Sequence, residues 1–310
     1  MTPSSPAPDR PIQAHAFWAY GPLSNLERVC VASFHAQGFD VQLWTYGDLP
    51  NAPPGITVRD ARDILPESAV FLNQAGSYAS FSDLFRYATL HRYGGLYADT
   101  DVIALQPASA LPRTPFLVTE RAVPTRQLMR LARRVMGYPI KYPVNNNVIY
   151  NPEPAAGNLI DLALAVAERY RKDRIAWGEL GPNLLTALTG LTPDHGFTVH
   201  APAFANPLAW WQCPTTLLAP APLALPAEAH FLHGFNELWR KAGIDKNAPF
   251  PAGSPMAQFA VQFGTAHPDV AGTPHTSPSG ATVRATAGHR PGQAISGRQA
   301  MVSSRSVTSA

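Results

Sequence analysis

Two acidic residues, Asp99 and Asp101, stand one residue apart directly after a short apolar run, Leu96–Ala98. Alternate residues of an extended segment project to the same side, so we expect the two carboxylates to lie together. Adjacent carboxylates repel each other unless a cation lies between them, and hard oxygen ligands suit Mg²⁺ or Mn²⁺. Such an ion commonly binds substrate phosphates and would stabilise a departing diphosphate as a Lewis acid. The plainer interpretation of this pair is an Asx-turn that closes a strand.

The residues before the acidic pair favour the chemical interpretation. Asp83 and Arg86 lie three positions apart within 80–93, a segment with a helical apolar period, so they share one helix face. Gly94 and Gly95 end this predicted helix and return the chain toward the strand that carries the acids. A carboxylate and a guanidinium beside a metal-bound diphosphate can bind sugar hydroxyls through charge-assisted hydrogen bonds. The alternative is a salt bridge within the helix.

The run from Phe81 to Leu105 resembles the signature of DXD sugar transferases in glycosyltransferase family 32, approximately S-D-x-x-R-x-x-x-L-x-x-x-G-G-x-Y-x-D-x-D. The resemblance implies a GT-A fold (Rossmann-like), transfer of a hexose with retention of configuration, and a UDP- or GDP-sugar donor. It also implies a saccharide or glycolipid acceptor and Mn²⁺ or Mg²⁺ as the cofactor. The matching positions are Ser82, Asp83, Arg86, Leu90, Gly94, Gly95, Tyr97, Asp99 and Asp101.

On this resemblance, Asp83, Arg86, Asp99 and Asp101 are the expected catalytic residues, and Tyr97 is expected at the donor. The two aspartates of the DXD element are the expected metal ligands.

Two further segments resemble donor-binding parts of the family. Residues 16–21 (Ala-Phe-Trp-Ala-Tyr-Gly) resemble its first strand, where an aromatic side chain packs on the nucleotide base. Trp18 matches that position and Phe17 precedes it; an ordinary core role is the alternative. Asn145 and Asn147 lie between expected strands, where the family carries an Asn-containing segment that faces the donor sugar. Amides suit hydroxyl recognition, although a polar turn is equally compatible with this sequence.

The segment 230–239 resembles a closing stretch in which related enzymes complete the metal shell or cover the diphosphate. On this basis His233 or Asn236 is a candidate metal or donor ligand, and Trp239 is a candidate cover for the phosphates. A core histidine satisfied by its neighbours is the alternative. Gly181-Pro182 resembles a Gly-Pro step before a late helix of the family and is interpreted as structural.

Element patterns predict a single α/β domain with two flanking segments. Residues 1–13 are an expected flexible leader, and 14–250 alternate short apolar runs with helical patterns, which indicates a parallel-sheet domain. The strand–helix–strand unit formed by 14–20, 25–37 and 41–46 is typical of such sheets. Residues 251–310 are rich in Gly, Ser, Thr, Pro and Ala without periodicity, so we expect a disordered C-terminal tail.

Composition argues against several partners. The net charge is +3, but four of the 24 Lys and Arg residues (Arg284, Arg290, Arg298 and Arg305) lie beyond the last acid, Asp269, which leaves 20 against 21 acids elsewhere. A nearly neutral body does not favour nucleic acid. The sequence contains no apolar run of membrane-spanning length and no signal-peptide pattern, so a cytoplasmic protein is expected. Peripheral association with a membrane-borne acceptor stays open.

Two other functions stay open on sequence alone. One is a phosphatase or phosphotransferase that uses Asp99 as its nucleophile, although no Gly-Asp-x-x-x-Asp segment follows. The other is a catalytically inactive protein that binds a sugar or a nucleotide. Turnover of phosphate esters without a nucleotide-sugar would indicate the first, and donor binding without turnover would indicate the second.

Overall fold

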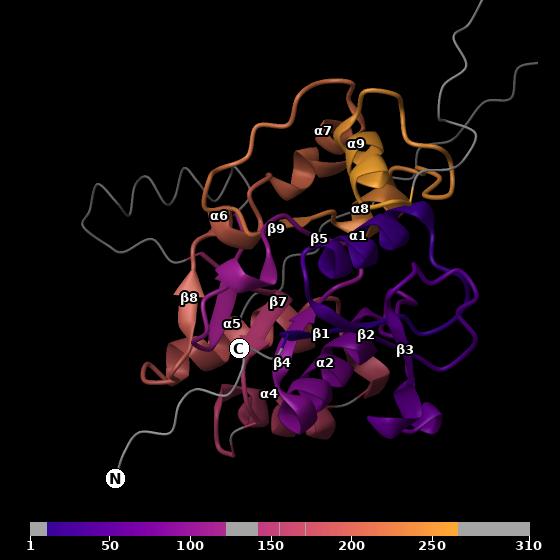
Figure 1. Cartoon of the computed structure of the whole chain (residues 1–310). Helices are drawn as coiled ribbons and strands as arrows, with labels where there is room; N and C mark the ends of the chain where they lie inside the picture. Colours follow the sequence, from indigo (N-terminus) through magenta and orange to yellow (C-terminus); the bar gives the residue numbers. More distant parts are fainter. Residues whose placement is uncertain (1–10, 122–141, 155, 171, 266–310) are drawn as a thin grey trace, which may run out of the picture. The chain divides into compact units, whose positions relative to one another are not determined.

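A seven-stranded sheet with the order β3-β2-β1-β4-β7-β6-β8 forms the centre of the protein (Figure 1). The computed structural model describes residues 11–121, 142–154, 156–170 and 172–265. The strands are β1 (Gln13–Phe17), β2 (Asp40–Thr45), β3 (Thr57–Asp60), β4 (Gly95–Ala98), β6 (Phe116–Thr119), β7 (Val144–Asn151) and β8 (Thr198–His200). A second, two-stranded sheet pairs β5 (Val102–Ala104) with β9 (Phe231–His233).

Helices cover both faces of the large sheet. On one face, α2 and α4 pack side by side and α5 packs next to α4, while α1, α6 and the β5–β9 sheet cover the other face. The described helices are α1 (Asn25–Ala36), α2 (Ala79–Tyr93), α4 (Leu159–Arg169), α5 (Leu184–Leu191), α6 (Pro202–Ala205), α7 (Cys213–Leu218), α8 (Asn236–Lys241) and α9 (Pro255–Gln262).

The first half of the sheet is parallel and follows from the local sequence. β1 pairs in parallel with both β2 and β4, and Ala14 of β1 lies opposite Val41 of β2 and Leu96 of β4. Helix α1 connects β1 with β2 and begins with a capping box between Ser24 and Glu27. The expected strand–helix–strand unit and the expected α/β class are therefore confirmed.

The turn from α2 into β4 requires two glycines. Gly94 and Gly95 have φ values of 67° and 83°, a region that side chains with a Cβ rarely adopt. A Cβ on Gly95 would also lie 2.7 Å from the carbonyl oxygen of Gln13, because β4 packs tightly against β1 here. The glycine pair thus lets the helix with Asp83 and Arg86 pass directly into the strand that precedes Asp99.

The second half of the sheet is antiparallel at β7. This strand runs against both β4 and β6, and the pairing with β6 shifts register between Leu117 and Val118. All of its residues are buried, including Asn145, Asn146 and Asn147. The asparagine run therefore lies within a central strand, and its placement between strands is corrected.

A third cluster of buried side chains extends the body beyond its expected end. It joins the outer face of α1 to α7, α8 and α9, and Met256 of α9 is 0% exposed within it. Residues 251–265 therefore belong to the folded body, because α9 packs against the helices around Trp239. The remainder of the expected tail, 266–310, and residues 1–10 of the expected leader lie outside the described residues.

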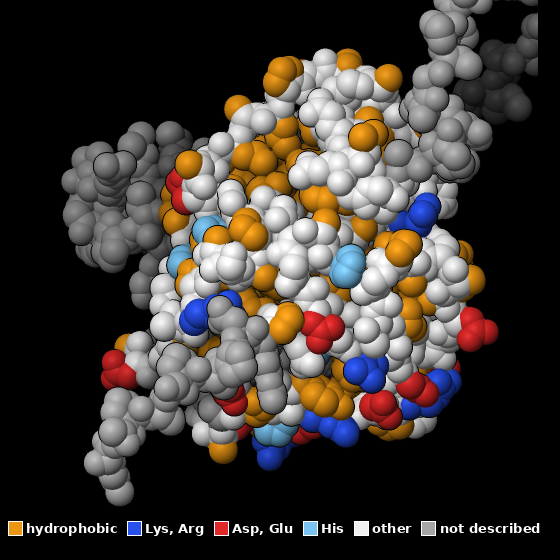
Figure 2. All heavy atoms as spheres, viewed as in Figure 1, with side chains coloured by type: hydrophobic (Ala, Val, Ile, Leu, Met, Phe, Trp, Pro, Cys, Tyr) orange, Lys and Arg blue, Asp and Glu red, His pale blue; other side chains and the backbone are white. Residues whose placement is uncertain are grey.

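The surface seen in the same view is unevenly composed. Hydrophobic side chains gather in the upper part of this face, near α7, while charged side chains lie mostly in its lower half (Figure 2). Among the described helices, none combines the length and the apolar character needed to cross a membrane.

Candidate active site

The two aspartates lie on the turn that joins β4 to β5. The backbone N–H of Asp99 donates to the carbonyl oxygen of Asn147 on β7 at 2.9 Å, so the sheet ladder continues to the first acid. The N–H of Val102 then donates to the Asp99 carbonyl at 3.1 Å and closes a turn around Thr100. This turn fixes both carboxylates relative to the sheet.

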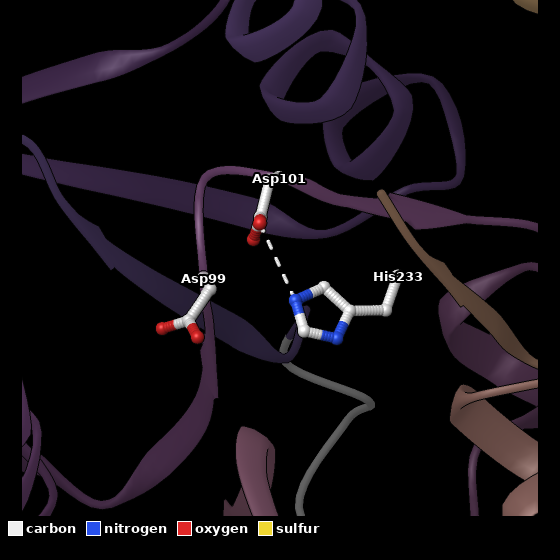
Figure 3. A group of neighbouring side chains, drawn as sticks. All are labelled: Asp99, Asp101 and His233. Carbon is white, nitrogen blue, oxygen red and sulfur yellow. Dashed lines mark ion pairs between the residues drawn. The ribbon is translucent and has the colours of Figure 1, made fainter. Parts of the chain in front are cut away.

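His233 lies beside the two aspartates although it is far from them in the sequence. It ends β9, and the pairing of β9 with β5 places His233 opposite Val102. Its Nε2 lies 3.3 Å from Oδ2 of Asp101 (Figure 3). One atom from each of Asp99, Asp101 and His233 lies within 4.8 Å of the others, which is a spacing that could hold one metal ion.

The chain that follows His233 holds Asp101 in place. The backbone N–H of Asn236 donates to Oδ2 of Asp101 at 2.7 Å, and the N–H of Gly234 donates to the Asp101 carbonyl at 2.7 Å. A Cβ on Gly234 would lie 2.9 Å from that carbonyl oxygen, so glycine is required for this approach. Phe235 has φ 54°, a strained conformation that directs the Asn236 N–H at the carboxylate.

Burial differs among the three candidate ligands. The side chain of Asp99 is 27% exposed, whereas those of Asp101 and His233 are 11% and 10% exposed. Asp99 therefore forms the open side of the group, where a substrate phosphate could share the ion. The two other side chains form its buried base.

The electrostatics of the group favour a cation. Burial raises the pKa of Asp99 to about 6, opposed by Arg86 and assisted by the charge of Asp101. Burial also favours neutral Asp101, but the charge and hydrogen bond of His233 and the Asn236 N–H hold its pKa below the ordinary value. Burial lowers the pKa of His233, but Asp101 outweighs that effect, so the net shift is upward. Asp99 therefore binds a proton more readily than a free aspartate does, and a divalent ion would displace that proton.

Arg86 connects the acidic turn to α2. Its guanidinium forms ion pairs with Asp83, at 2.6 Å, and with Asp99, and it lies 4.9 Å from the centre of the Tyr97 ring. Arg86 is 2% exposed, so both carboxylates depend on it for charge compensation. The intrahelical salt bridge considered for Asp83 and Arg86 is present, and it extends to the DXD aspartate.

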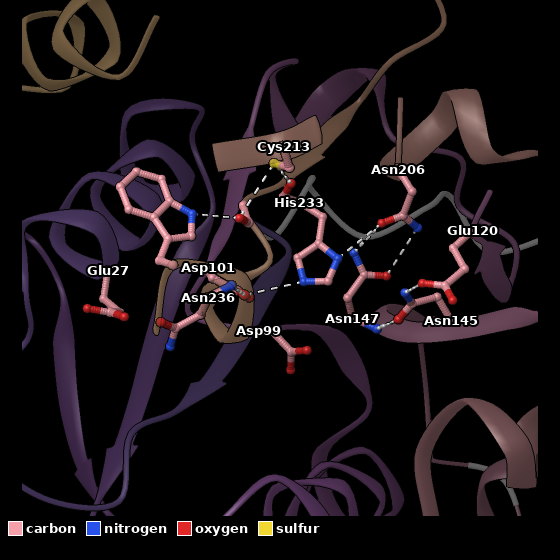
Figure 4. A network of polar contacts seen from close by, with 12 residues as sticks. Glu27, Asp99, Asp101, Glu120, Asn145, Asn147, Asn206, Cys213, His233 and Asn236 are labelled. Atoms are coloured by element: carbon pink, nitrogen blue, oxygen red, sulfur yellow. Dashed lines mark hydrogen bonds and ion pairs between the residues drawn. The ribbon is translucent and has the colours of Figure 1, made fainter. Parts of the chain in front are cut away.

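Alternation along β7 places the asparagines on two sides. Asn146 donates its Nδ2–H to Oδ1 of Asp83 at 2.6 Å. On the opposite side, Asn145 donates to Glu120 at 2.6 Å and Asn147 donates to Asn206 at 3.0 Å (Figure 4). The expected polar segment therefore borders both the Asp83–Arg86 pair and the histidine.

Three residues expected at the donor lie in the core instead. Phe17 stacks on Phe85 with ring centres 4.2 Å apart, inside the aromatic cluster between the sheet and α2. Tyr97 is 0% exposed beneath Arg86, and Trp239 is 1% exposed and donates its Nε1–H to the Gly234 carbonyl at 2.9 Å. Neighbouring side chains enclose these three residues, so the prediction that they contact the donor is wrong.

Trp18 and Asn236 lie differently from these three. Trp18 is partly exposed at the end of β1, and the ammonium of Lys246 lies 5.6 Å from the centre of its ring. Asn236 contacts Asp101 through its backbone N–H rather than its amide. A role of Trp18 at the nucleotide base stays a prediction.

The structure adds two polar residues that sequence reasoning did not select, Glu120 and Asn206, and it gives Asn146 of the expected asparagine segment a specific partner. Asn146 binds Asp83, Glu120 binds Asn145, and Asn206 lies between Asn147 and His233. For Asn146, the alternation of the asparagine run was an available signal. Glu120 and Asn206 have no local motif, because only the packing of β6 and α6 against β7 brings them here.

The family comparison matches the acidic turn. Residues 39–117, about a quarter of the chain, match the family model described as the glycosyltransferase sugar-binding region containing the DXD motif. This range contains Asp83, Arg86, Asp99 and Asp101. Among the curated proteins, none matches the chain at a significant level.

Solved structures of glycosyltransferases are similar at a distance. The PaToxG glycosyltransferase is 16% identical with a TM-score of 0.40, covering 58% of this chain and 69% of its own. The galactosyltransferase LgtC, solved with donor and acceptor sugar analogues, is 14% identical with a TM-score of 0.39, covering 72% and 86%. The WbbM bifunctional glycosyltransferase is 8% identical with a TM-score of 0.39, covering 74% and 46%.

Structural likeness at this level does not assign an activity, whereas the matched region carries the motif itself. Residues 39–117, which contain Asp99 and Asp101, are thus similar to the DXD-containing sugar-binding region of glycosyltransferases, in agreement with the resemblance to family 32.

Proposed function

We propose that this glycosyltransferase moves a hexose from a UDP- or GDP-sugar to a hydroxyl group of a saccharide or glycolipid, and that it requires Mn²⁺ or Mg²⁺. The observation that supports the metal is the convergence of Asp99, Asp101 and His233 atoms within 4.8 Å. Two carboxylates and one imidazole are a suitable donor set for Mn²⁺. When bound, the ion supplies Lewis-acid stabilisation of the diphosphate leaving group.

The chain's own residues position this chemistry. Asp101 and His233 form the buried base of the ion site, and the more exposed Asp99 faces the donor phosphates. Arg86 balances the charge of Asp99, which keeps that carboxylate in one orientation while the donor enters. The Asn236 N–H holds Asp101 in the same way at 2.7 Å. These contacts preorganise the site before the substrate binds.

Asp83, Arg86 and Asn146 form the side of the site that we assign to the sugar. Asp83 accepts from both Arg86 and Asn146 at 2.6 Å, so its carboxylate has a fixed orientation. Such a carboxylate can select a pattern of sugar hydroxyls by accepting charge-assisted hydrogen bonds from them. Asn145 and Asn147 extend the polar lining, and Trp18 is the proposed platform for the base.

We further propose that the sugar keeps its anomeric configuration. Asp83 is engaged by two donors, which suits positioning better than nucleophilic attack. Attack by the acceptor on the face that the diphosphate leaves, with a donor phosphate oxygen accepting the hydroxyl proton, requires no protein nucleophile. The anomeric configuration of the first-formed product, measured by proton NMR, tests this step; inversion would exclude it.

The main test is donor turnover by the purified full chain. Nucleotide-sugars are supplied as a panel with Mn²⁺, with EDTA, and with Mn²⁺ restored after EDTA. We expect turnover of at least one donor, its loss in EDTA, and its recovery with the ion. Asp101→Ala should abolish turnover, whereas Asp194→Ala, which alters an exposed acid, should not. Full activity in EDTA, or in Asp101→Ala, would refute the metal-dependent proposal.

The setting we propose is the cytoplasm, where nucleotide-sugars are available to a reduced protein. Both cysteines, Cys30 and Cys213, are free and buried, which suits a reducing compartment. Transfer to a glycolipid would require contact with a membrane surface, and comparing soluble with vesicle-borne acceptors distinguishes the two acceptor classes.

A further inference from the structure

Asn206 lies at the centre of a buried hydrogen-bond network beside the proposed metal site. It follows α6, is 0% exposed, and its backbone N–H donates to the Pro202 carbonyl at 2.8 Å. Its side chain contacts Thr119 on β6, Asn147 on β7 and His233 on β9. Three separate strands therefore fix one amide.

The contacts of this amide determine which of its ends faces the histidine. Nδ2 of Asn206 donates to the backbone carbonyl of Thr119 at 3.0 Å, and a carbonyl can only accept. Oδ1 of Asn206 accepts from Nδ2 of Asn147 at 3.0 Å. The oxygen end therefore faces Nδ1 of His233, 3.2 Å away (Figure 4).

An amide oxygen at this position selects one tautomer of the imidazole. A neutral histidine has one nitrogen that donates and one that accepts. Because Asn206 offers only an acceptor to Nδ1, a neutral ring that donates to Asn206 carries its hydrogen on Nδ1, and its Nε2 keeps a lone pair for a metal ion. Nε2 is the nitrogen directed at Asp101, 3.3 Å from Oδ2.

We propose that Asn206 is a positioning residue for metal binding: by accepting the Nδ1–H of His233, it makes Nε2 the ligating nitrogen. The inference rests on the metal-dependent function proposed above. Without this acceptor, the ring can place its hydrogen on Nε2 and donate it to Asp101 instead. His233 and Asp101 would then bind each other rather than the metal ion. Partners of this kind are worth roughly 10- to 100-fold in metal affinity.

Two substitutions separate positioning from mere packing. Asn206→Leu removes the acceptor toward Nδ1 at similar volume. Asn206→Asp keeps an oxygen toward Nδ1 but loses the Nδ2–H donated to Thr119. If Asn206 only secured the loop after α6, both variants would have similar effects. If it sets the tautomer, Asn206→Asp should retain metal affinity and Asn206→Leu should lose it.

The first readout requires no metal. Long-range proton–nitrogen NMR of the full chain labelled with ¹⁵N-histidine reports which ring nitrogen carries the hydrogen at a pH where the ring is neutral. The His233 signal is assigned by its loss in His233→Gln. We expect the Nδ1–H tautomer in the wild type and in Asn206→Asp, and a shift toward Nε2–H in Asn206→Leu. An Nε2–H tautomer in the wild type would overturn the proposal even if Asn206→Leu failed to fold.

The second readout is the affinity for Mn²⁺ alone, titrated by electron paramagnetic resonance. We expect a loss of about 10- to 100-fold in Asn206→Leu and an affinity near wild type in Asn206→Asp. Asn151→Leu is the matched control, since Asn151 is buried at 2% exposure and contacts Leu90 and Asn158 rather than His233. Its Mn²⁺ affinity should be unchanged.

The outcomes distinguish this inference from the proposed function. A wild type that binds no Mn²⁺ would contradict the metal site itself. Wild-type binding with equal affinity in Asn206→Leu, or equal losses in Asn206→Leu and Asn206→Asp, would leave the metal site standing and reject the role of Asn206.

Discussion

Arg86 compensates the buried carboxylate of Asp83 and the partly exposed carboxylate of Asp99. It lies between Asp83 and Asp99, and its own side chain is 2% exposed. Replacing it with methionine would leave buried Asp83 and partly exposed Asp99 without their cation. We expect Arg86→Met to lower the free energy of unfolding by about 3–5 kcal/mol, measured by urea denaturation, because an unpaired buried charge is strongly destabilising.

An exposed arginine provides the control for this prediction. Arg62 pairs with Asp60 and Glu67 while about half exposed, at 48%. Arg62→Met should change the free energy of unfolding far less than Arg86→Met does, since solvent screens such pairs. Arg86→Lys should recover only part of the loss, because a lysine has no planar fork to bridge two carboxylates. Equal effects of the two methionine variants would contradict this account of Arg86.

Gly181 lies against the residues that we assign to the sugar. A Cβ at this position would lie 2.6 Å from Nδ2 of Asn146 and 2.9 Å from Oδ2 of Asp83. The hydrogen bond from the Tyr87 hydroxyl to the Leu180 carbonyl, 2.8 Å, limits how far this loop can retreat. We therefore expect Gly181→Ala to displace the sugar-binding side chains and to reduce the transfer rate roughly 100-fold.

Gly190, in the following helix α5, is the matched control. Nothing lies within 4 Å of a Cβ built there. Gly190→Ala should raise the free energy of unfolding by about 1 kcal/mol through helix propensity and leave transfer unchanged. Steady-state transfer kinetics and urea denaturation of both variants test the pair, and wild-type rates in Gly181→Ala would contradict the assigned contact.

Among single residues, the sequence predicted those whose geometry is set by near neighbours. Asp83, Arg86, Asp99 and Asp101 lie on one helix, one glycine turn and one strand end, so their spacing fixes their proximity. Phe17 was assigned to the donor together with Trp18, although neighbouring residues of a strand project to opposite faces. Whether Trp239 is buried depends on which side of α8 faces the core, and the packing of α7 and α9 determines that side.

At the scale of elements, β1 carries a buried histidine next to the glycine turn. His15 is 1% exposed, and its Nδ1 lies 3.3 Å from Nε1 of Trp44, which can only donate. Burial lowers the pKa of His15 to about 4 from 6.5, and this outweighs the charge of Asp40. Between pH 6.5 and about 4, His15 is therefore neutral in the folded state and protonated in the unfolded chain.

The sign of the pH dependence follows from this difference. The stabilisation is complete above pH 6.5 and is lost as the pH falls toward 4, because only the unfolded chain is protonated in that window. The loss attributable to His15 is about 3 kcal/mol. Urea denaturation across this range should give a shallower pH slope in His15→Gln. An unchanged slope in His15→Gln would contradict the assignment.

The elements themselves were partly predictable. The β1–α1–β2 unit and the α2–β4 turn follow from apolar period, a capping box and two glycines. Strand β7 was missed because its three asparagines suggest a turn. Their amides are satisfied by Asp83, Glu120 and Asn206, and only the tertiary fold supplies those partners.

At the scale of the whole molecule, α9 shows where composition misleads. Residues 251–265 share the Gly, Pro and Ala content of the segment that follows, yet Met256 is fully buried and Val261 is 72% exposed. We expect Met256→Ala to lower the free energy of unfolding by about 2–5 kcal/mol, because it leaves a cavity between α9 and its neighbours. Val261→Ala should change it by about 0.5 kcal/mol or less.

Thermal and urea denaturation of the two variants measure this difference. A negligible effect of Met256→Ala on the free energy of unfolding would indicate that 251–265 belong to the disordered tail expected from the sequence. The sequence did not reveal this helix, because α9 is stabilised by side chains of α1 and α7 that lie far away along the chain.

The pairing of β9 with β5 has a consequence for biosynthesis. The two aspartates leave the ribosome early, within one continuous stretch, but the histidine that joins them emerges only near the end of the folded body. An unfinished polypeptide therefore carries two of the three candidate ligands, and on the proposed function its metal site is complete only after β9 has been made.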